Sequence, residues 1–324
     1  MQVQQLPIYK FLEGSGNSFI IPVYQRDYAW TKVNCQKLWN DLIDLNNKDR
    51  KDHFLGTIVT IGSGFEEYTI IDGQQRLTTI SILLIALQAF LKNKVDINEG
   101  ENVLVQKILD FLIDRHSHDE AKRIRLKPNK QDQEHFQKLF SEVKVLNIDS
   151  NIISNFNFFY EKIGSGLLSP NDVFEAFRKL KIVLIDLVRG QDDPQLIFES
   201  LNSTGVDLTA GDLIRNYILM DLEPQDQERL YKDYWINIEK FAGDVAEFIR
   251  IYLIFKTKTS IKKDDVYATF KKSSLELFAK DKNLILKDLL FFAQIYSYLV
   301  QICNHPNPSI NKELSRLSKL EFTV

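Results

Sequence analysis

The chain has 324 residues, of which 44% are hydrophobic and 26% charged, with a net charge of −3 and a sequence pI of about 6.0. This composition is typical of a soluble globular protein with enough chain for two domains, and it excludes a protein that coats nucleic acid with a uniformly basic surface. The only cysteines, Cys35 and Cys303, fit neither a disulfide framework nor a zinc site. The N-terminus lacks a secretion signal, and the longest apolar run, 80–91, is too short to span a bilayer. We therefore expect a cytoplasmic protein without a membrane segment.

Residues 1–95 alternate between β-rich and helix-periodic segments, which predicts an α/β unit. Gly62-Ser63-Gly64 separates two β-rich runs and indicates a hairpin, and Thr31 is suited to cap a helix. The expected elements are strands at 19–23, 54–61 and 67–71, a helix after Thr31 that buries Leu38, Trp39, Leu42 and Leu45, and a largely buried helix at 77–91.

Residues 96–180 change character and are mostly helical, so we expect a helical insertion there. Its predicted elements are helices at 103–113 and 133–143, an exposed strand at 123–127, and a helix that starts at Ser169-Pro170. Further elements are a buried strand at 181–188, helices at 194–201 and 210–220, the second capped by Thr209, and helices throughout 223–320.

Together these segments predict an α+β fold with a mixed-sheet core followed by a mostly helical C-terminal region. We expect a first domain at 1–220, with the helical insertion at about 96–180, and an all-helical domain at 221–324.

The most informative stretch is Asp72-Gly73-Gln74-Gln75-Arg76, where an apolar strand runs through a polar turn into a long apolar helix. Such a turn exposes backbone N–H groups and the positive end of the helix dipole, which favours an anion. Gly73 lets a ligand approach the backbone, Arg76 can fork onto phosphate oxygens, and Asp72 can hold a metal ion or orient a hydroxyl. An ordinary turn, capped by Asp72 and otherwise solvated, explains the same spacing.

A second candidate site is Tyr24-Gln25-Arg26-Asp27-Tyr28-Ala29-Trp30, in which aromatic, amide and guanidinium groups follow a strand. Aromatic rings stack on bases, and Gln and Arg read base edges or phosphates. The alternative is that Tyr28 and Trp30 are half-buried anchors for the next helix. A third candidate is the polar loop 198–209, which otherwise serves to cap the following helix.

Basic residues gather between Arg115 and Lys130, including Arg123, Arg125 and Lys127, and again between Lys256 and Lys263. Either run can track a phosphate backbone, although a solvated face is the more common reason for such a pattern. No paired-histidine metal motif, Ser/His/Asp arrangement with a recognisable elbow, or Walker-type phosphate loop is present in the sequence.

Three blocks occur in one order: IPVYQRDYAW (21–30), DGQQRLTT (72–79) and FESLNSTGVDLTAGDLIRNYIL (198–219). They resemble the N-terminal domain of GmrSD-type, modification-dependent (type IV) restriction proteins, a domain shared with defence proteins that sense DNA phosphorothioation. The resemblance covers roughly residues 5–220, and neither the QR block nor the DGQQR block departs from the pattern.

This resemblance implies a core similar to the ParB/sulfiredoxin fold and NTP binding or hydrolysis at the DGQQR motif. It also implies a C-terminal HNH nuclease domain in the full proteins. The chain shows no histidine-rich nuclease motif, so we expect that domain beyond residue 324 or on another polypeptide. A homo-oligomer is left open.

On this basis we expect an NTP-dependent sensor and regulatory part of an anti-phage restriction system, with an NTP and Mg²⁺ as cofactors and modified phage DNA as partner. The expected catalytic residues are Asp72, Gln74, Gln75 and Arg76, with Asp72 as the metal ligand; the nucleotide-binding residues are Gln25, Arg26, Gly73, Thr78 and Asn202; and the DNA- or modification-reading residues are Tyr24, Tyr28, Trp30, Arg123, Arg125 and Lys127.

Three competing hypotheses remain open. The DGQQR turn grips a DNA phosphate without NTP turnover, or the fold is itself a metal-dependent nuclease that uses Asp72, or the chain is a scaffold that binds a toxin or another partner and keeps a vestigial pocket.

Overall fold

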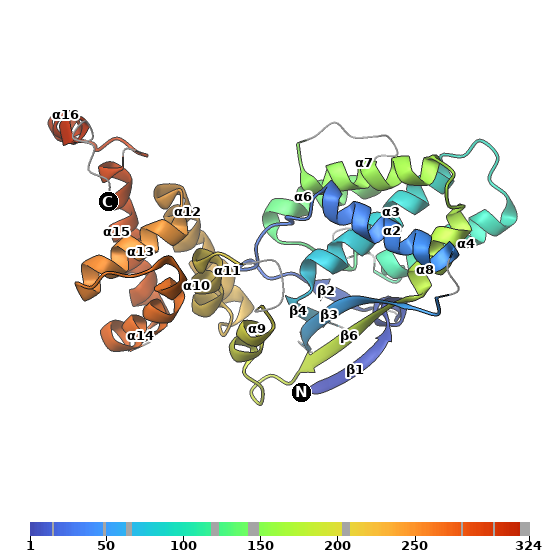
Figure 1. The fold of residues 1–324 in the computed structure, drawn as a ribbon, viewed down its shortest axis with the longest axis horizontal. Helices are drawn as coiled ribbons and strands as arrows, with labels where there is room; N and C mark the ends of the chain where they lie inside the picture. Colours follow the sequence, from blue (N-terminus) through green and yellow to red (C-terminus); the bar gives the residue numbers. More distant parts are fainter. Residues whose placement is uncertain are drawn as a thin grey trace. The chain divides into compact units, whose positions relative to one another are not determined.

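The computed structural model describes residues 1–14, 16–47, 50–62, 67–117, 123–141, 149–202, 208–279, 281–300 and 302–317. The chain divides into two compact units, Met1–Pro194 and Gln195–Val324. The first contains a mixed six-stranded sheet with helices, and the regular elements described in the second are all helices, so the fold is α+β as predicted (Figure 1). The division between the units falls at Pro194, whereas the sequence predicted a domain boundary at 220.

The sheet of the first unit has the strand order β1-β6-β3-β4-β2-β5. Pairs β1–β6 and β3–β4 are antiparallel, and the other neighbours are parallel. The β3–β4 pair is the hairpin that the glycines at 62 and 64 predicted. The strands are β1 (Gln2–Pro7), β2 (Ser18–Ile20), β3 (His53–Gly62), β4 (Glu67–Asp72), β5 (Leu126–Lys127) and β6 (Leu180–Leu187).

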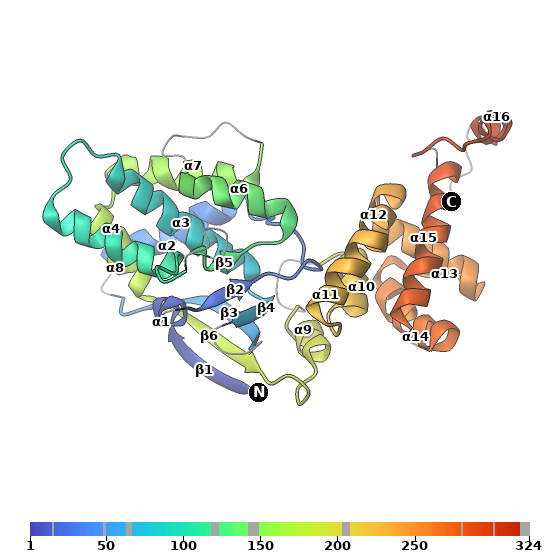
Figure 2. The ribbon, with the colours of Figure 1, turned by 180° about the vertical axis from the view of Figure 1, so that it is seen from behind.

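Helices of the first unit pack on one face of this sheet, and α2, α3 and α7 lie on that same side in both views (Figures 1 and 2). They share one apolar core with the sheet residues Ile58 and Ile70. The predicted insertion at 96–180 contributes Ile108, Phe156 and Phe177 to this core rather than forming a separate one. The helices are α1 (Ile8–Leu12), α2 (Lys32–Asn47), α3 (Gln74–Lys92), α4 (Glu99–Leu112), α6 (Lys130–Ser141), α7 (Asn151–Gly164) and α8 (Pro170–Arg178).

The long apolar helix α3 is the centre of the first unit. Among the described helices, it alone is long and apolar enough to cross a membrane, but 83% of its apolar window is buried inside the protein. Its residues Leu77, Ile80, Leu84 and Leu87 are fully buried, so α3 has the burial of the core helix of a soluble protein.

Two predicted strands are shorter than expected. Strand β2 ends at Ile20 because Pro22 lacks an N–H and its carbonyl accepts the N–H of Gln25 in a turn. The strand expected at 123–127 is regular only at Leu126–Lys127. The residues before it pair with the end of α4 instead, since Arg125 N donates to Leu112 O at 3.0 Å.

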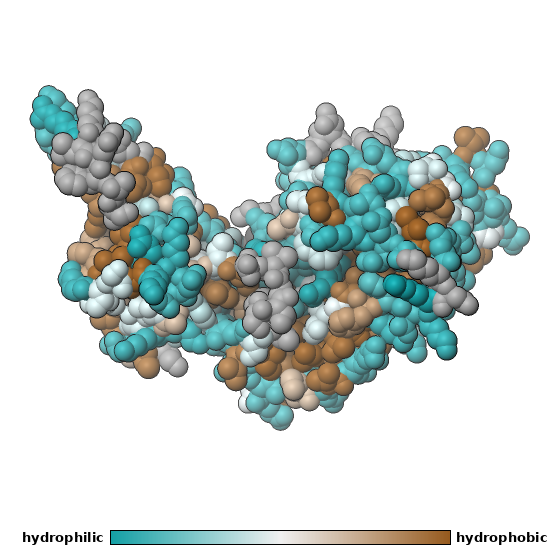
Figure 3. All heavy atoms as spheres, viewed as in Figure 1, coloured by the Kyte–Doolittle hydropathy of each residue, from teal (hydrophilic) through white to brown (hydrophobic). Residues whose placement is uncertain are grey.

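The face of the sheet that is opposite these helices carries exposed apolar side chains. Val3 on the edge strand β1 is 56% exposed and Phe54 on β3 is 54% exposed. Figure 3 shows apolar residues gathered over β1 and β6 on this side of the unit.

The second unit is built from helices around a core that includes Trp235, Phe248 and Leu289. This agrees with the helical region expected at 221–324 for the part of it that is described. Its elements are α9 (Pro194–Asn202), α10 (Ala210–Leu219), α11 (Pro224–Leu230), a π-helical turn at Tyr231–Trp235, α12 (Ile236–Ala242), α13 (Val245–Thr257), a 3₁₀ turn at Lys263–Asp265, α14 (Val266–Phe278), α15 (Lys282–Leu299) and α16 (Pro308–Leu317).

Candidate functional site

The turn between β4 and α3 depends on Gly73 for two reasons. Its φ is +89°, a left-handed conformation that side chains with a Cβ rarely adopt. A Cβ at this position would also lie 2.9 Å from Thr57 O and 3.1 Å from the Cα of Ile58, both on β3. Gly73 therefore lets α3 start directly against the neighbouring strand, and no side chain caps the helix there.

Arg76, in the first turn of α3, lies over Gly56 of β3. A Cβ at Gly56 would stand 2.6 Å from the Nε of Arg76, so the absence of a side chain makes room for the guanidinium. Its Nη1 donates to Thr57 O at 2.6 Å and lies 3.6 Å from Asp72 Oδ2. Among the described residues no partner contacts its Nε or Nη2, and 26% of its side chain is exposed. One edge of the fork is therefore anchored, and the other remains available.

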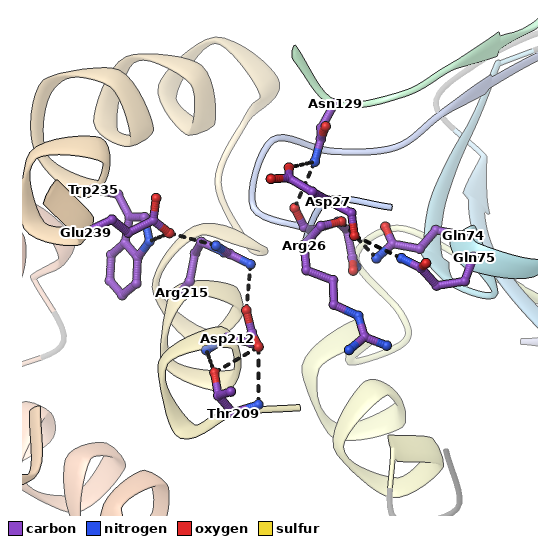
Figure 4. Close-up of polar contacts among 11 residues, drawn as sticks. Arg26, Asp27, Gln74, Gln75, Asn129, Thr209, Asp212, Arg215, Trp235 and Glu239 are labelled. Atoms are coloured by element: carbon purple, nitrogen blue, oxygen red, sulfur yellow. Dashed lines mark hydrogen bonds and ion pairs between the residues drawn. The ribbon is translucent and has the colours of Figure 1, made fainter. Parts of the chain in front are cut away.

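The two amides of the motif hold the 25–30 segment in place (Figure 4). Gln75 Oε1 accepts the N–H groups of Ala29 at 2.8 Å and Trp30 at 3.2 Å, and its Nε2 donates to Asp27 O. Gln74 Nε2 donates to Arg26 O at 3.3 Å, while its buried Oε1 has no partner among the described residues. The sequence predicted both as catalytic residues; in the structure both side chains are buried and bonded to the 25–30 segment.

Further polar side chains tie the same segment to the rest of the unit. Gln25 Nε2 donates to Ile71 O at 2.8 Å, which joins the segment to the end of β4. Asn129 Nδ2 donates to Gln25 O and to Asp27 Oδ1, and Asn155 Nδ2 donates to Trp30 O at 2.7 Å. The 25–30 segment is thus fixed by side chains from α3, α7 and the residue before α6.

Burial alters two titratable groups in this network. Desolvation raises the pKa of Asp132, whose Oδ2 accepts the N–H of Tyr28 at 2.6 Å, to about 6. Desolvation also raises the pKa of the Tyr28 phenol, which bonds to Thr79 Oγ1 at 2.7 Å and accepts from Asn155 Nδ2 at 3.0 Å. Tyr28 therefore stays neutral and serves as a buried link between α3 and α7.

The predicted aromatic reading edge is mostly inside the protein. Tyr24 is 1% exposed and Tyr28 is 6% exposed, so neither ring offers a face on which a base can stack. That expectation fails because both rings pack in the interior of the first unit. Trp30 is only partly buried, which fits the alternative of a half-buried anchor.

The other predicted nucleotide-binding residues differ in their exposure. Arg26 is partly exposed, and no described residue pairs with its guanidinium; its side chain extends away from the amides of Gln74 and Gln75 (Figure 4). Thr78 is 2% exposed and faces the interior. Asn202 ends α9, but its side chain lies outside the described residues, as do residues 203–207 of the third motif.

The basic stretch is divided between surface and interior. Arg123 is exposed and Lys127 partly exposed, so both can meet a phosphate. Arg125 is 6% exposed, and its Nη1 donates to Leu12 O at 2.9 Å. Arg125 is therefore not a surface contact for duplex DNA, contrary to the sequence prediction.

The described end of the third motif stabilises the second unit. Thr209 and Asp212 form a capping box at the start of α10. Arg215 is held between Asp212 Oδ1 and Glu239 Oε1, each at 2.8 Å, and Glu239 Oε1 also accepts the indole N–H of Trp235 at 2.7 Å (Figure 4).

Asp72 is a single carboxylate, and the described residues contain no group of three or more His, Cys, Asp or Glu side chains that could hold a metal ion. A lone carboxylate still fits Mg²⁺ when a nucleotide supplies phosphate oxygens, because Mg²⁺ commonly takes one or two protein carboxylates and keeps several waters. The donor set thus fits Mg²⁺ only together with oxygen atoms from a bound ligand.

Sequence reasoning missed several residues of this network: Gly56, Thr57, Asn129, Asp132 and Asn155. Gly56 inside a β-rich run was a usable signal, since a glycine within a strand often marks a bulge or a close approach, and the register of β3 does shift there. The polar residues carried no such signal, because their partners are remote in sequence.

The comparisons with known proteins identify the family. Residues 8–219 match the family described as GmrSD restriction endonuclease, N-terminal domain. No curated protein matches the chain. Because the match covers well over half of the sequence, the chain belongs to this family and is part of a restriction system that acts on DNA.

Proposed function

We propose that this member of the GmrSD N-terminal domain family is the NTP-binding regulatory part of a modification-dependent restriction system. In this proposal the start of α3 binds the phosphates of the nucleotide. The observation that carries the proposal is the uncapped N-terminus of α3, which lies beside an arginine fork with one free edge.

The phosphate site would combine three kinds of donor. The N–H groups of the first turn, from Gln74 to Arg76, precede the first helical bond, which runs from Leu77 N to Gly73 O. Arg76 supplies Nε and Nη2, since its Nη1 already contacts Thr57 O and Asp72. Backbone and guanidinium donors of this kind suit a phosphate better than a neutral ligand.

Asp72 would hold Mg²⁺ beside these phosphates, and the ion would neutralise charge on the transferred group. Its ion pair with Arg76 keeps the carboxylate at the mouth of the turn. Gln74 and Gln75 would act indirectly, by holding the segment that carries Arg26. Arg26 would then approach the phosphates as a second cation.

Among the residues predicted to read DNA, only those that are at least partly exposed are kept in this proposal. Arg123, Lys127 and the partly exposed Trp30 would contact modified phage DNA, and the chain would regulate a nuclease centre of the HNH type. We place this system in the cytoplasm, where it meets incoming DNA.

The test is isothermal titration of the chain with ATP, GTP, CTP and UTP plus Mg²⁺, together with an assay of phosphate release. We expect at least one NTP to bind and Arg76→Ala to weaken it by about tenfold or more, with Arg76→Lys intermediate. Arg316→Ala is the matched control, since Arg316 only pairs with Glu313 on the exposed helix α16. Unchanged NTP affinity in Arg76→Ala would remove the phosphate assignment.

The same geometry supports a second candidate, in which the turn grips a DNA phosphate and no NTP is turned over. The uncapped helix start favours it equally, because a DNA phosphate is also an anion. DNA binding that weakens steeply with salt, depends on Arg76 and is indifferent to NTP would select this candidate. The third candidate, a nuclease that uses Asp72 alone, finds no support in the described residues, which offer no carboxylate cluster.

A further inference from the structure

The first unit contains a cavity of about 470 Å³. None of the DGQQR residues 72–76 lines it. Its walls come from α1, α4, α8 and the residues that precede β5. This volume falls within the range of pockets that bind small molecules. No residue assigned to the proposed NTP site lines this cavity.

Arg125 lies at the wall of this cavity and is a buried cation that forms no ion pair with any described residue. It is 6% exposed, and the only described hydrogen bond of its side chain runs from Nη1 to Leu12 O. Its Nε is buried with no partner, and no carboxylate forms an ion pair with it among the described residues. Burial lowers the pKa of Arg125, and the charges of Asp114 and Asp110 offset this only in part. A buried guanidinium in this situation is stabilised by a bound anion.

A second available cation stands at the rim. Lys107 on α4 is exposed, lines the cavity and has no ion pair among the described residues. The other arginines are already engaged: Arg115 pairs with Asp110 at 2.8 Å, and Arg178 pairs with Glu175 at 3.3 Å. The available positive charge of the cavity is therefore that of Arg125 and Lys107.

Aromatic side chains complete the wall. The rings of Phe111 and Phe174 lie 6.3 Å apart at an angle of 36°, and Tyr9 lies beneath the guanidinium of Arg178 at 5.3 Å. Planar rings and a stacked guanidinium favour a flat partner. Asp114, also at the wall, can accept hydrogen bonds from amino or hydroxyl groups.

We propose that this cavity binds a nucleoside 5′-monophosphate, with the phosphate on Arg125 and Lys107 and the base against the partly exposed rings of Phe111 and Tyr9. The guanidinium of Arg125 and the ammonium of Lys107 supply positive charge and N–H donors to the phosphate, and the aromatic wall supplies the apolar contact that a free phosphate ion cannot use. This site is separate from the proposed NTP site, and the proposal does not rest on that one.

The experiment titrates the whole chain with AMP, GMP, CMP and UMP, and separately with inorganic phosphate and with adenosine. At least one monophosphate is expected to bind about tenfold or more tightly than either inorganic phosphate or adenosine, because each of these lacks half of the contacts. Inorganic phosphate that binds as tightly as every nucleotide would overturn the assignment of the aromatic wall. Absence of binding by every probe would overturn the site.

Variants locate the ligand. Lys107→Glu on the exposed rim is expected to weaken the monophosphate by about tenfold or more, and Lys37→Glu, an equal charge reversal on the exposed face of α2, is expected to change it by less than about twofold. Arg125→Lys keeps the charge but loses the fork and is expected to weaken binding similarly. Thermal unfolding of each variant confirms that it folds.

A result in which Lys107→Glu and Arg125→Lys bind as the unaltered chain does would refute the proposal. Loss of monophosphate binding in Arg76→Ala, with Lys107→Glu unaffected, would also refute it, because the ligand would then occupy the start of α3.

Discussion

Gln75 Oε1 lies 2.8 Å from the main-chain nitrogen of Ala29, 46 residues away along the chain, and so joins the DGQQR motif to the YQRDYAW segment. The same oxygen accepts from Trp30 N, and the amide nitrogen donates to Asp27 O. The two motifs that look like separate binding elements in the sequence are one structural unit. The backbone of Arg26 is therefore held against the start of α3, although its guanidinium has no partner among the described residues.

Removal of the Gln75 amide is expected to destabilise the first unit. Gln75→Ala leaves partly buried N–H and C=O groups of the 27–30 segment without these partners, so the free energy of unfolding should fall by about 1–3 kcal/mol. Urea unfolding followed by circular dichroism measures this change. Gln36→Ala is the control, since Gln36 only bonds to Asn40 on the outer face of α2, and its effect should stay within about 0.5 kcal/mol. Equal effects of the two changes would show that the hydrogen bonds of Gln75 to the 27–30 segment do not contribute to stability.

A comparison of Gly73 with Gly166 distinguishes the cost of a steric contact from the cost of a left-handed backbone conformation. Both have positive φ, +89° and +74°, but a Cβ at Gly73 meets Thr57 O at 2.9 Å whereas one at Gly166 meets nothing within 4 Å. Gly166→Ala should cost about 1 kcal/mol of unfolding free energy from conformation alone, and Gly73→Ala about 2–3 kcal/mol or more. Thermal unfolding of the two variants measures the difference. A smaller effect at Gly73 than at Gly166 would contradict the close approach of β3.

Asp132 makes stability depend on pH. Its pKa in the folded protein is raised to about 6 from a usual 3.8, so the folded state holds this proton where the unfolded state has lost it. Stability from this group therefore increases as the pH falls from about 6 towards 4, and above pH 6 the buried charge is unfavourable. Asp27 adds to the raised pKa, whereas the Tyr28 N–H and His135 oppose it.

Asp132→Asn is expected to remove this dependence. At pH 8 the variant should be more stable than the unaltered chain by about 1–2 kcal/mol, less than the full shift because the side chain is partly exposed. The difference should shrink as the pH falls below 6 and vanish near pH 4, where the carboxyl begins to be protonated in the unfolded state as well. Thermal unfolding from pH 5 to 8 tests this, with Asp149→Asn on the exposed surface as control. A constant difference across that range would contradict the burial argument.

Arg215 is expected to contribute much more to the stability of the second unit than Arg229, another arginine in an ion pair of that unit. Arg215→Ala leaves Asp212 and Glu239 without their shared cation in a site where the arginine side chain is only 9% exposed, which should cost about 3–5 kcal/mol. Arg229→Ala breaks an ion pair with Asp226 whose side chains are about half exposed, and should cost less than about 1 kcal/mol. Similar midpoints of thermal unfolding for the two variants would contradict this assignment.

Local sequence patterns predicted most of the elements correctly. The apolar periodicity of α2 placed Leu38, Trp39, Leu42 and Leu45 in the core, and all four are buried. Ser169-Pro170 predicted the start of α8, which has a capping box with Asp172. These predictions succeed because periodicity and helix caps act over a few neighbouring residues.

The candidate site was predicted less completely. The strand–turn–helix at 67–91 and the need for Gly73 followed from the local pattern, and the structure confirms both. The reading roles of Tyr24, Tyr28 and Arg125 failed, because aromatic and basic residues in a polar-looking run were assumed to face the solvent. Arg125 contacts the end of α1, and Tyr28 contacts α3 and α7, so their burial depends on segments that lie far from them in sequence.

The sequence by itself determined the family, through three ordered blocks, and the α+β elements that carry them. Only the tertiary structure decided which polar groups of those blocks are used internally and which remain available. Gln74 and Gln75 bond to backbone atoms nearly fifty residues away, whereas Arg76 keeps one edge of its fork unpaired among the described residues. The physical reason is that a strand or a helix cap follows from neighbouring residues, but the partner of a buried amide is set by how distant segments pack.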